Sequence, residues 1–155
     1  MKYFTIDQWI VDQEPETSAE PGPTSYEQYL TYVDGIRPQL PAEFQPLTRE
    51  VILHDARLVA MKATTEESTV KLTLTPGPHT DRDWVQLELL YIGVGRVHFK
   101  SDPDKGLAGP NGFGDLGYDE IELLGGGMFE HRMLFSSGIE LSIEFAAFHL
   151  ERHQK

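Results

Sequence analysis

An imidazole lies in the middle of an apolar run near the end of the chain. His131 belongs to the stretch FEHRMLFSSGIELSIEF, residues 129–145. Strand alternation places it on the same face as Met133 and Phe135, and that face is expected to be buried. A buried polar group without a hydrogen-bond partner costs about 1 to 3 kcal/mol, so a partner is expected nearby. Histidine is also the side chain most often used as a general base, so this position could carry chemistry.

The stretch YDEIEL, residues 118–123, offers an acidic partner. If Ile121 and Leu123 face the core, Asp119 shares their face. A connecting loop of three residues would place Asp119 directly opposite His131, and a loop of five would place it on the diagonal. We therefore predict an Asp119–His131 hydrogen bond that fixes the tautomer of the ring.

A carboxylate that orients a histidine is half of a hydrolase arrangement. Ser136 or Ser137 would then be the nucleophile. Both serines fall in a predicted hairpin turn, away from the face of the ring, and the sequence contains no nucleophile elbow. We therefore favour a structural role for His131 and predict no catalytic residue.

The stretch LHDAR contains a second His–Asp pair, His54 and Asp55. Adjacent side chains on a strand point to opposite sides, so these two are not expected to converge on one ion. A metal site would need His54 with His98 or His131 from other strands, and cysteine is absent. We predict no metal and no cofactor. The alternative is a small ligand- or metal-binding domain, or an enzyme, with a pocket lined by His54, Asp55, His98, Asp119 and His131.

Acidic residues dominate the composition. The chain has 25 Asp and Glu against 13 Lys and Arg, a formal net charge of -12. This charge repels nucleic acid and anionic lipid, so neither is an expected partner, and it favours a basic partner. A solvated surface is the simpler interpretation of the acidic strand positions. The functional interpretation is an anionic platform for a basic protein, built from Glu88, Glu120, Glu122, Glu140, Glu144 and, among them, Arg132.

Two helices are expected before the sheet. A capping-box spacing begins at Thr5 and another at Ser25, and each precedes apolar residues at helical intervals. The second helix is expected to end near Gly35. Residues 36–50 contain three prolines and are expected to form a connector with one helical turn.

From residue 51 the hydrophobic period changes to two, which is typical of strands. One predicted strand breaks at Gly93 and Gly95, where a bulge or bend would redirect the chain. In the last hairpin a three-residue turn places His131 opposite Ile143 on the buried side and Arg132 opposite Ser142 on the polar side. There Arg132 is expected to lie diagonal to Glu140 and Glu144. The predicted segments are 51–62, 69–75, 84–99 and two hairpins over about 118–135 and 128–148.

These elements predict an α+β fold in a single domain over residues 1–155. A meandering antiparallel sheet, about residues 50–150, would be covered on one face by the two helices of an N-terminal part, about residues 5–46. The sequence shows no signal-peptide pattern and no apolar stretch near the roughly 20 residues of a membrane span, so a cytoplasmic location is expected.

The opening MKYFT, the stretch LHDARL, and the closing stretches YDEIE and FEHRMLFSSGIELSIEF together resemble a group of small uncharacterised bacterial proteins. Some of these look like the immunity proteins of polymorphic toxin systems. The resemblance implies a cytoplasmic, non-enzymatic protein that binds and blocks a toxin. We therefore expect a protein-binding module whose acidic sheet face and 101–117 loop meet a basic partner. A homodimer through an uncovered sheet face or strand edge is a third alternative.

Overall fold

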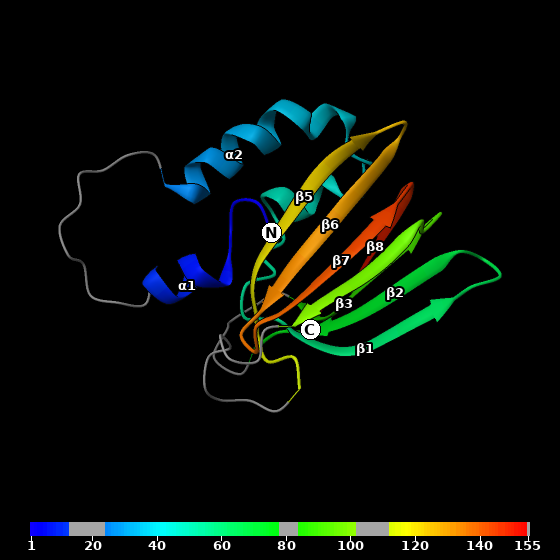
Figure 1. The fold of residues 1–155 in the computed structure, drawn as a ribbon. Helices are drawn as coiled ribbons and strands as arrows, with labels where there is room; N and C mark the ends of the chain where they lie inside the picture. The colour runs from blue at the N-terminus through cyan, green and yellow to red at the C-terminus, as the bar shows by residue number, and fades with distance from the viewer. Residues whose placement is uncertain (13–23, 78–83, 102–111, 155) are drawn as a thin grey trace.

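The computed structural model describes residues 1–12, 24–77, 84–101 and 112–154 (Figure 1). Within them the chain forms α1 (Ile6–Asp12) and α2 (Ser25–Ile36), followed by two short 3-10 helices, η1 (Arg37–Gln39) and η2 (Gln45–Thr48). The strands that follow are β1 (Arg57–Thr64), β2 (Thr69–Thr75), β3 (Trp84–Ile92), β4 (Arg96–Ser101), β5 (Leu116–Gly125), β6 (Met128–Phe135), β7 (Ile139–Phe145) and β8 (Ala147–Gln154).

The described strands form two antiparallel four-stranded sheets. Sheet A has the order β1-β2-β3-β8, and sheet B has the order β4-β7-β6-β5. Two bent strands join the sheets, because β3 continues into β4 through residues 93–95 and β7 continues into β8 through Ala146. The bends lie side by side, since Ala146 N donates to Ile92 O at 3.0 Å. Gly93 has φ +65°, and a Cβ there would lie 3.0 Å from the Cβ of Ala146, so the bend requires glycine.

The α+β class and the antiparallel pairing agree with the sequence-based prediction, but the single meandering sheet does not. The difference arises at β4, which pairs with β7, and at β8, which pairs with β3. Residues 147–154, AFHLERHQ, alternate only weakly between apolar and polar side chains, so their sequence gives a weak strand signal. The break predicted at Gly93 and Gly95 is confirmed, and it marks the passage from sheet A to sheet B.

The last hairpin has the predicted register. Gly138 has φ 82°, as the expected three-residue turn needs. His131 pairs with Ile143, and Met133 pairs with Leu141. The imidazole of His131 is fully buried, with 0% of the residue exposed, so the inward orientation predicted for it is confirmed.

The two helices begin where cap residues satisfy their first N–H groups. Thr5 Oγ1 accepts from Gln8 N at 3.2 Å, which confirms the predicted start of α1. In α2 the capping box is formed by Thr24 and Glu27, one residue before the predicted Ser25. This helix continues through Gly35 and passes directly into η1, so the glycine does not end it.

The helices cover the sheets differently from the prediction. α2 lies along the edge of β5 (Figure 1), where the hydroxyls of Tyr29 and Tyr32 accept from Ile121 N at 2.8 Å and Leu123 N at 3.1 Å. These bonds protect an edge strand that would otherwise present unpaired N–H groups. α1 packs against sheet B through Trp9, whose ring lies next to Leu134. The ring also fills the position that a side chain at Gly117 would occupy.

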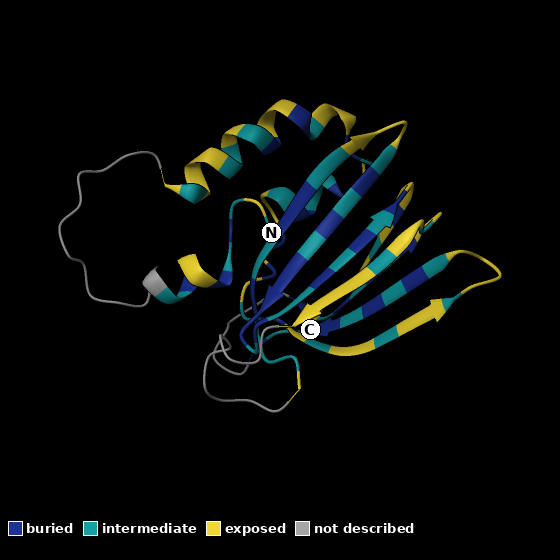
Figure 2. Ribbon diagram, viewed as in Figure 1, coloured by how far each residue is buried: buried dark blue, intermediate teal, exposed yellow. Residues whose placement is uncertain are grey.

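The proline-rich connector forms part of the core. Phe44 in this connector is 1% exposed. The centroid of its ring lies 5.0 Å from that of His131 and 4.8 Å from that of Phe148. It therefore contacts both sheets. The strands differ in burial, as Figure 2 shows. β6 is buried or partly buried along its length, whereas β1 is largely exposed. The other buried residues between η1 and β1 are Leu40, Leu47, Val51, Leu53 and Ala56.

Candidate functional site

A chain of hydrogen bonds crosses the interior between the two sheets. The hydroxyl of Tyr91, on β3, lies 2.7 Å from Nδ1 of His131, on β6. Nε2 of the same ring lies 3.1 Å from Oδ2 of Asp119, on β5. The predicted Asp119–His131 bond is thus confirmed, and it takes the diagonal arrangement because Ile121 is the residue directly opposite His131.

The partners of His131 assign its tautomer. Burial, and then the charge of Asp119, raise the pKa of Tyr91 well above its ordinary value, so the phenol keeps its proton. The phenol can then donate to Nδ1, and we infer that Nδ1 is the acceptor of this bond. Nε2 then carries the hydrogen and donates to Asp119. This neutral form satisfies both ring nitrogens without adding a second charge to the core.

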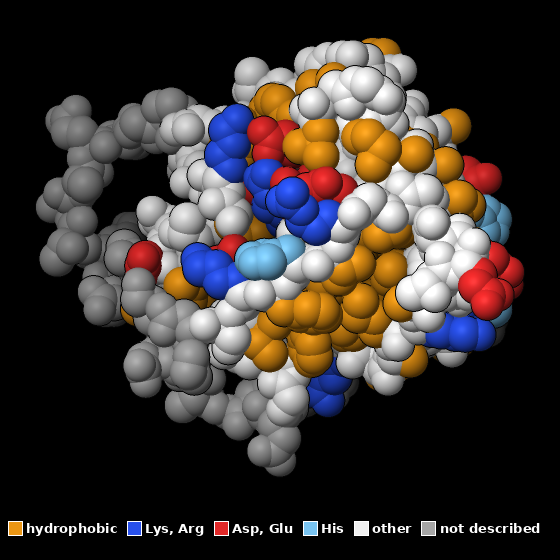
Figure 3. All heavy atoms as spheres, turned by 45° about the vertical axis from the view of Figure 1, so that its right-hand side comes forward, with side chains coloured by type: hydrophobic (Ala, Val, Ile, Leu, Met, Phe, Trp, Pro, Cys, Tyr) orange, Lys and Arg blue, Asp and Glu red, His pale blue; other side chains and the backbone are white. Residues whose placement is uncertain are grey.

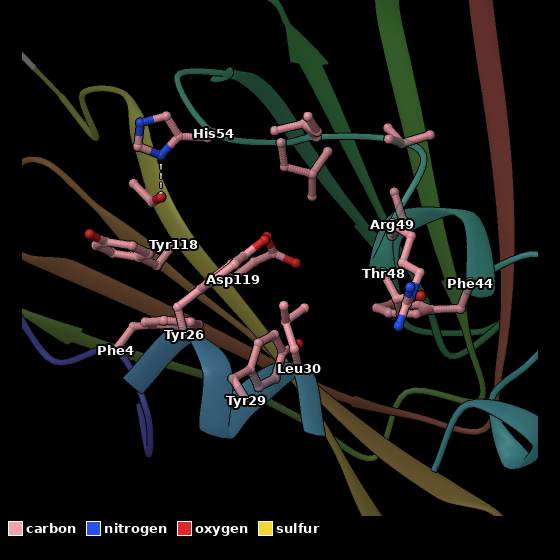
Figure 4. Close-up of a pocket in the computed structure, with 15 residues that line it drawn as sticks. Phe4, Tyr26, Tyr29, Leu30, Phe44, Thr48, Arg49, His54, Tyr118 and Asp119 are labelled. Carbon is pink, nitrogen blue, oxygen red and sulfur yellow. Dashed lines mark hydrogen bonds between the residues drawn. The ribbon is translucent and has the colours of Figure 1, made fainter. Parts of the chain in front are cut away.

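Asp119 opens on a cavity of about 400 Å³ between α2, β5 and the segment 44–54. Its side chain is 25% exposed, whereas that of His131 behind it is fully buried. Figure 4 shows the carboxylate directed into this space, with Leu30 beside it and Arg49 across from it. The cavity is lined by Phe4, Tyr26, Tyr29, Leu30, Phe44, Leu47, Thr48, Arg49, Val51, Ile52, Leu53, His54, Gly117, Tyr118 and Asp119.

Aromatic side chains form one end of this cavity. The rings of Phe4 and Tyr118 stack with their centroids 4.7 Å apart, and Phe4 meets Tyr29 edge to face at 5.3 Å. Burial, and then the nearby charge of Asp119, raise the pKa of Tyr29 above its ordinary value, so its hydroxyl also stays protonated. These contacts hold the rings in place without a ligand.

His54 and Asp55 correct a sequence-based expectation. They precede β1, and Asp55 has φ 64°, so the rule for adjacent strand residues does not apply to them. His54 Nε2 lies 3.4 Å from Asp55 Oδ1, and its Nδ1 donates to the carbonyl of Gly117 at 2.6 Å. The bond from Asp55 N to Leu116 O, 2.7 Å, fixes this segment to β5. His54 therefore stands at the wall of the cavity that contains Asp119.

His98 does not join this group. It lies on β4, opposite Ser142, and lines a smaller surface hollow of about 220 Å³ together with Arg132 and Glu130. Of the five residues proposed for a His/Asp pocket, the structure brings His54 and Asp119 to one cavity. His131 lies behind Asp119, Asp55 contacts His54, and His98 is on the opposite face of sheet B.

The outer face of sheet B holds a buried carboxylate. Glu120 is 1% exposed. Its carboxylate accepts from the N–H groups of three successive residues, Lys2 at 2.8 Å, Tyr3 at 2.7 Å and Phe4 at 2.7 Å. Arg132 Nη1 lies 3.6 Å from the same carboxylate. Glu120 is therefore buried and bonded within the fold, so a partner cannot reach it.

Arg132 holds two further carboxylates of this face. It lies opposite Ser142, as predicted, but its ion pairs are with Glu122 and Glu130 rather than with the diagonal glutamates of β7. Partial burial lowers the pKa of Arg132, yet the hydrogen bonds to Glu130 and Glu122 outweigh this and raise the pKa above its ordinary value.

The glutamates of β7 have partners of their own. Glu140 lies 3.0 Å from the ammonium group of Met1 and 3.4 Å from Lys100 Nζ. Glu144 lies 3.5 Å from Arg96. On the face that Figure 3 shows, acidic side chains lie next to basic ones, and a broad hydrophobic area lies beside them. The predicted anionic platform is therefore divided into local ion pairs.

Glu88 lies on sheet A, apart from the other glutamates of the predicted platform. It accepts from Lys71 Nζ at 2.9 Å and from Gln86 Nε2 at 3.2 Å. The bond from Lys71 lowers the pKa of Glu88. Its neighbours Glu151 and His153 bring possible metal-binding atoms within 4.8 Å of one another. Because Lys71 already neutralises Glu88, we assign no metal to this group.

Three residues that line the cavity, and Tyr91, which contacts His131 behind it, were not identified from the sequence. Phe4, Tyr29 and Tyr118 come from three separate elements, so no local spacing joins them. Tyr91 gave a weak signal, because it shares a strand face with Leu87 and Leu89 and its hydroxyl needs a partner once buried.

The chain matches no model of a known protein family, and no curated protein matches it. No helix in the described residues is long and apolar enough to span a membrane. The predicted 101–117 binding loop falls largely on residues 102–111, which lie outside the described part of the chain.

Proposed function

We propose that this protein is a binding domain for a small organic ligand, which occupies the cavity at Asp119. The observation that supports the proposal is the Asp119 carboxylate, which is held from behind by buried His131 and opens on a cavity with aromatic walls. A small ligand-binding domain is also the alternative that the sequence predicts.

The composition of the cavity suits such a role. Binding sites for small molecules are commonly about 300 to 1,000 Å³ in volume and mainly apolar, with a few polar groups in fixed positions. Here the volume is about 400 Å³. Asp119 is fixed by His131, and His54 is fixed by Gly117. Since both polar groups are held by the fold, little ordering is needed when a ligand binds.

The arrangement favours binding over hydrolysis. The Ser136 Oγ accepts from Asp115 N at 3.0 Å, in the turn that follows β6. Both nitrogens of His131 are engaged, one with Tyr91 and one with Asp119. Activation of a serine would need a free ring nitrogen facing that hydroxyl. His131 therefore serves to position Asp119.

Binding of a basic protein, including an immunity-like role, stays a prediction from the sequence. The net charge of -12 favours it. The glutamates expected to form the contact face are engaged within the fold, Glu120 most completely. For this reason we propose ligand binding in the cavity rather than binding of a basic protein.

A fragment screen by ligand-observed NMR tests the proposal. We expect the wild-type protein to bind a set of small amphipathic fragments. The variant Leu30→Trp, which fills the cavity from α2, should lose them. Gln28→Trp adds the same ring to an exposed position of α2 that does not line the cavity, and it should bind as wild type does. Absence of any bound fragment, or equal binding by Leu30→Trp, contradicts the proposed function.

A further inference from the structure

The cavity carries an unbalanced negative charge. Asp119 contacts His131, which the hydrogen-bond partners assign as neutral. Among the residues that the structure describes, no Lys or Arg forms an ion pair with Asp119. The carboxylate therefore has no basic side chain of the described residues beside it while three quarters of its side chain is removed from water, and a ligand that supplies a positive charge would be bound strongly.

The arginine that lines the cavity, Arg49, is already neutralised. Arg49 Nη2 lies 2.6 Å from Oδ2 of Asp34 on α2. This pair joins α2 to the residue that follows η2, and Figure 4 shows Arg49 across the cavity from Asp119. Because the charge of Arg49 is matched by Asp34, an anionic ligand would meet Asp119 without a free cation to offset it. The net charge of -12 disfavours an anion further.

The aromatic end of the cavity suits a positive charge as well. The faces of aromatic rings carry negative potential and attract ammonium groups. Phe4, Tyr29 and Tyr118 line the cavity on the same side as Asp119, as Figure 4 shows. A cation at this end of the cavity would be attracted in two independent ways. The aromatic rings attract it through the cation–π interaction, and the carboxylate accepts a charge-assisted hydrogen bond from it.

We infer that the ligand is an organic cation, an ammonium group attached to an apolar or aromatic body. The ammonium donates to Asp119, and the body lies against the rings of Phe4, Tyr29 and Tyr118. This inference rests on the proposed function, because it names the chemical class of the molecule in the same cavity.

Three small molecules of similar shape and different charge test the inference by calorimetry. They are 2-phenylethylamine, which is a cation at neutral pH, 2-phenylethanol, which is neutral, and phenylacetate, which is an anion. We expect the alcohol to bind at least about tenfold more weakly than the amine, since a charge-assisted hydrogen bond contributes more than a neutral one. Phenylacetate should not bind at millimolar concentration.

Two variants assign the preference to one carboxylate. Asp119→Asn keeps an oxygen that can accept from His131 Nε2, so the fold is expected to persist while the charge is lost. In this variant the affinity for the amine should fall to that for the alcohol. Glu144→Gln removes one negative charge from the outer face of sheet B and should leave all three affinities unchanged.

The outcomes separate the two proposals. If the alcohol binds as tightly as the amine, or Asp119→Asn keeps the preference for the amine, the cation assignment is wrong and the cavity remains a binding site. If none of the three molecules binds while the fragment screen succeeds, the cation assignment is again wrong. If the fragment screen also fails, both proposals are wrong.

Discussion

Two carboxylates that are adjacent in β5 have opposite situations. Asp119 points between the sheets, contacts a neutral histidine and reaches a cavity. Glu120 points to the outer face, where three backbone N–H groups and Arg132 surround it. Both side chains are carboxylates, and their types alone do not distinguish their roles. Their surroundings decide that one is available to a ligand and that the other serves only the fold.

The difference lies in how many donors each carboxylate receives. Glu120 is almost completely buried, and its donors replace the water that it loses. Asp119 is partly exposed and has one strong donor from the protein, which leaves acceptor capacity directed into the cavity. An acidic residue that the fold does not saturate is the better candidate for binding.

The largest effect is expected from Glu120→Ala. Removal of the carboxylate leaves the N–H groups of Lys2, Tyr3 and Phe4 without their acceptor and leaves Arg132 with one fewer partner. Removing one partner of a buried charged group typically costs about 3 to 5 kcal/mol. Urea unfolding should show a loss of this size in the free energy of unfolding.

Glu144→Ala is the matched control for that variant. Glu144 lies on the same outer face but forms its ion pair with the largely exposed Arg96. Such surface pairs contribute about 0 to 1 kcal/mol. If the two alanine variants lose similar stability, the contrast drawn between a saturated buried carboxylate and a surface carboxylate fails.

A smaller loss is expected from Tyr91→Phe, which removes the hydroxyl that donates to His131. The buried Nδ1 is then unpaired, which should lower the free energy of unfolding by about 1 to 3 kcal/mol. Tyr26→Phe removes a hydroxyl from a residue that is 58% exposed and should change stability little. Equal, negligible effects of both variants would show that the Tyr91–His131 bond does not stabilise the interior.

Alkaline pH should reveal the same buried phenol. The pKa of Tyr91 is raised well above 10.0 in the folded protein, whereas the unfolded chain has the ordinary value. The unfolded state therefore loses this proton first, so the stability is complete below about pH 10 and falls as the pH rises further. Each such tyrosine contributes a slope of about 1.4 kcal/mol per pH unit.

Tyr29 shifts in the same direction, so wild-type stability should fall with the combined slope of two tyrosines above this pH. Tyr91→Phe should remove about half of that slope. Urea midpoints measured across the alkaline range test this, and an unchanged slope in Tyr91→Phe would be inconsistent with a protonated, buried Tyr91.

Local patterns in the sequence predicted a substantial part of this structure. The alternation in residues 129–145 gave the register of the last hairpin, the buried position of His131 and, with the alternation of residues 118–123, its bond to Asp119. The glycines at 93 and 95 gave the bend. Each of these features depends on neighbours within one or two strands, where strand period and turn geometry are decisive.

The features that the sequence did not predict depend on contacts between distant segments. Tyr91 reaches His131 only because the chain bends from one sheet into the other. Glu120 is buried because residues 2–4 lie across β5, and alternation alone placed it on a polar face. The cavity has walls from α2, β5 and the connector, and no spacing along the chain relates these elements.

The location of ligand binding tests the central claim most directly. We propose to titrate isotopically labelled protein with 2-phenylethylamine and to follow the backbone amide chemical shifts. The largest changes should occur at Leu30, Leu53, Gly117 and Asp119, and in Asp119→Asn they should need about tenfold more ligand. Changes centred instead on Glu130 and Ser142, on the outer face of sheet B, would contradict a ligand site at Asp119.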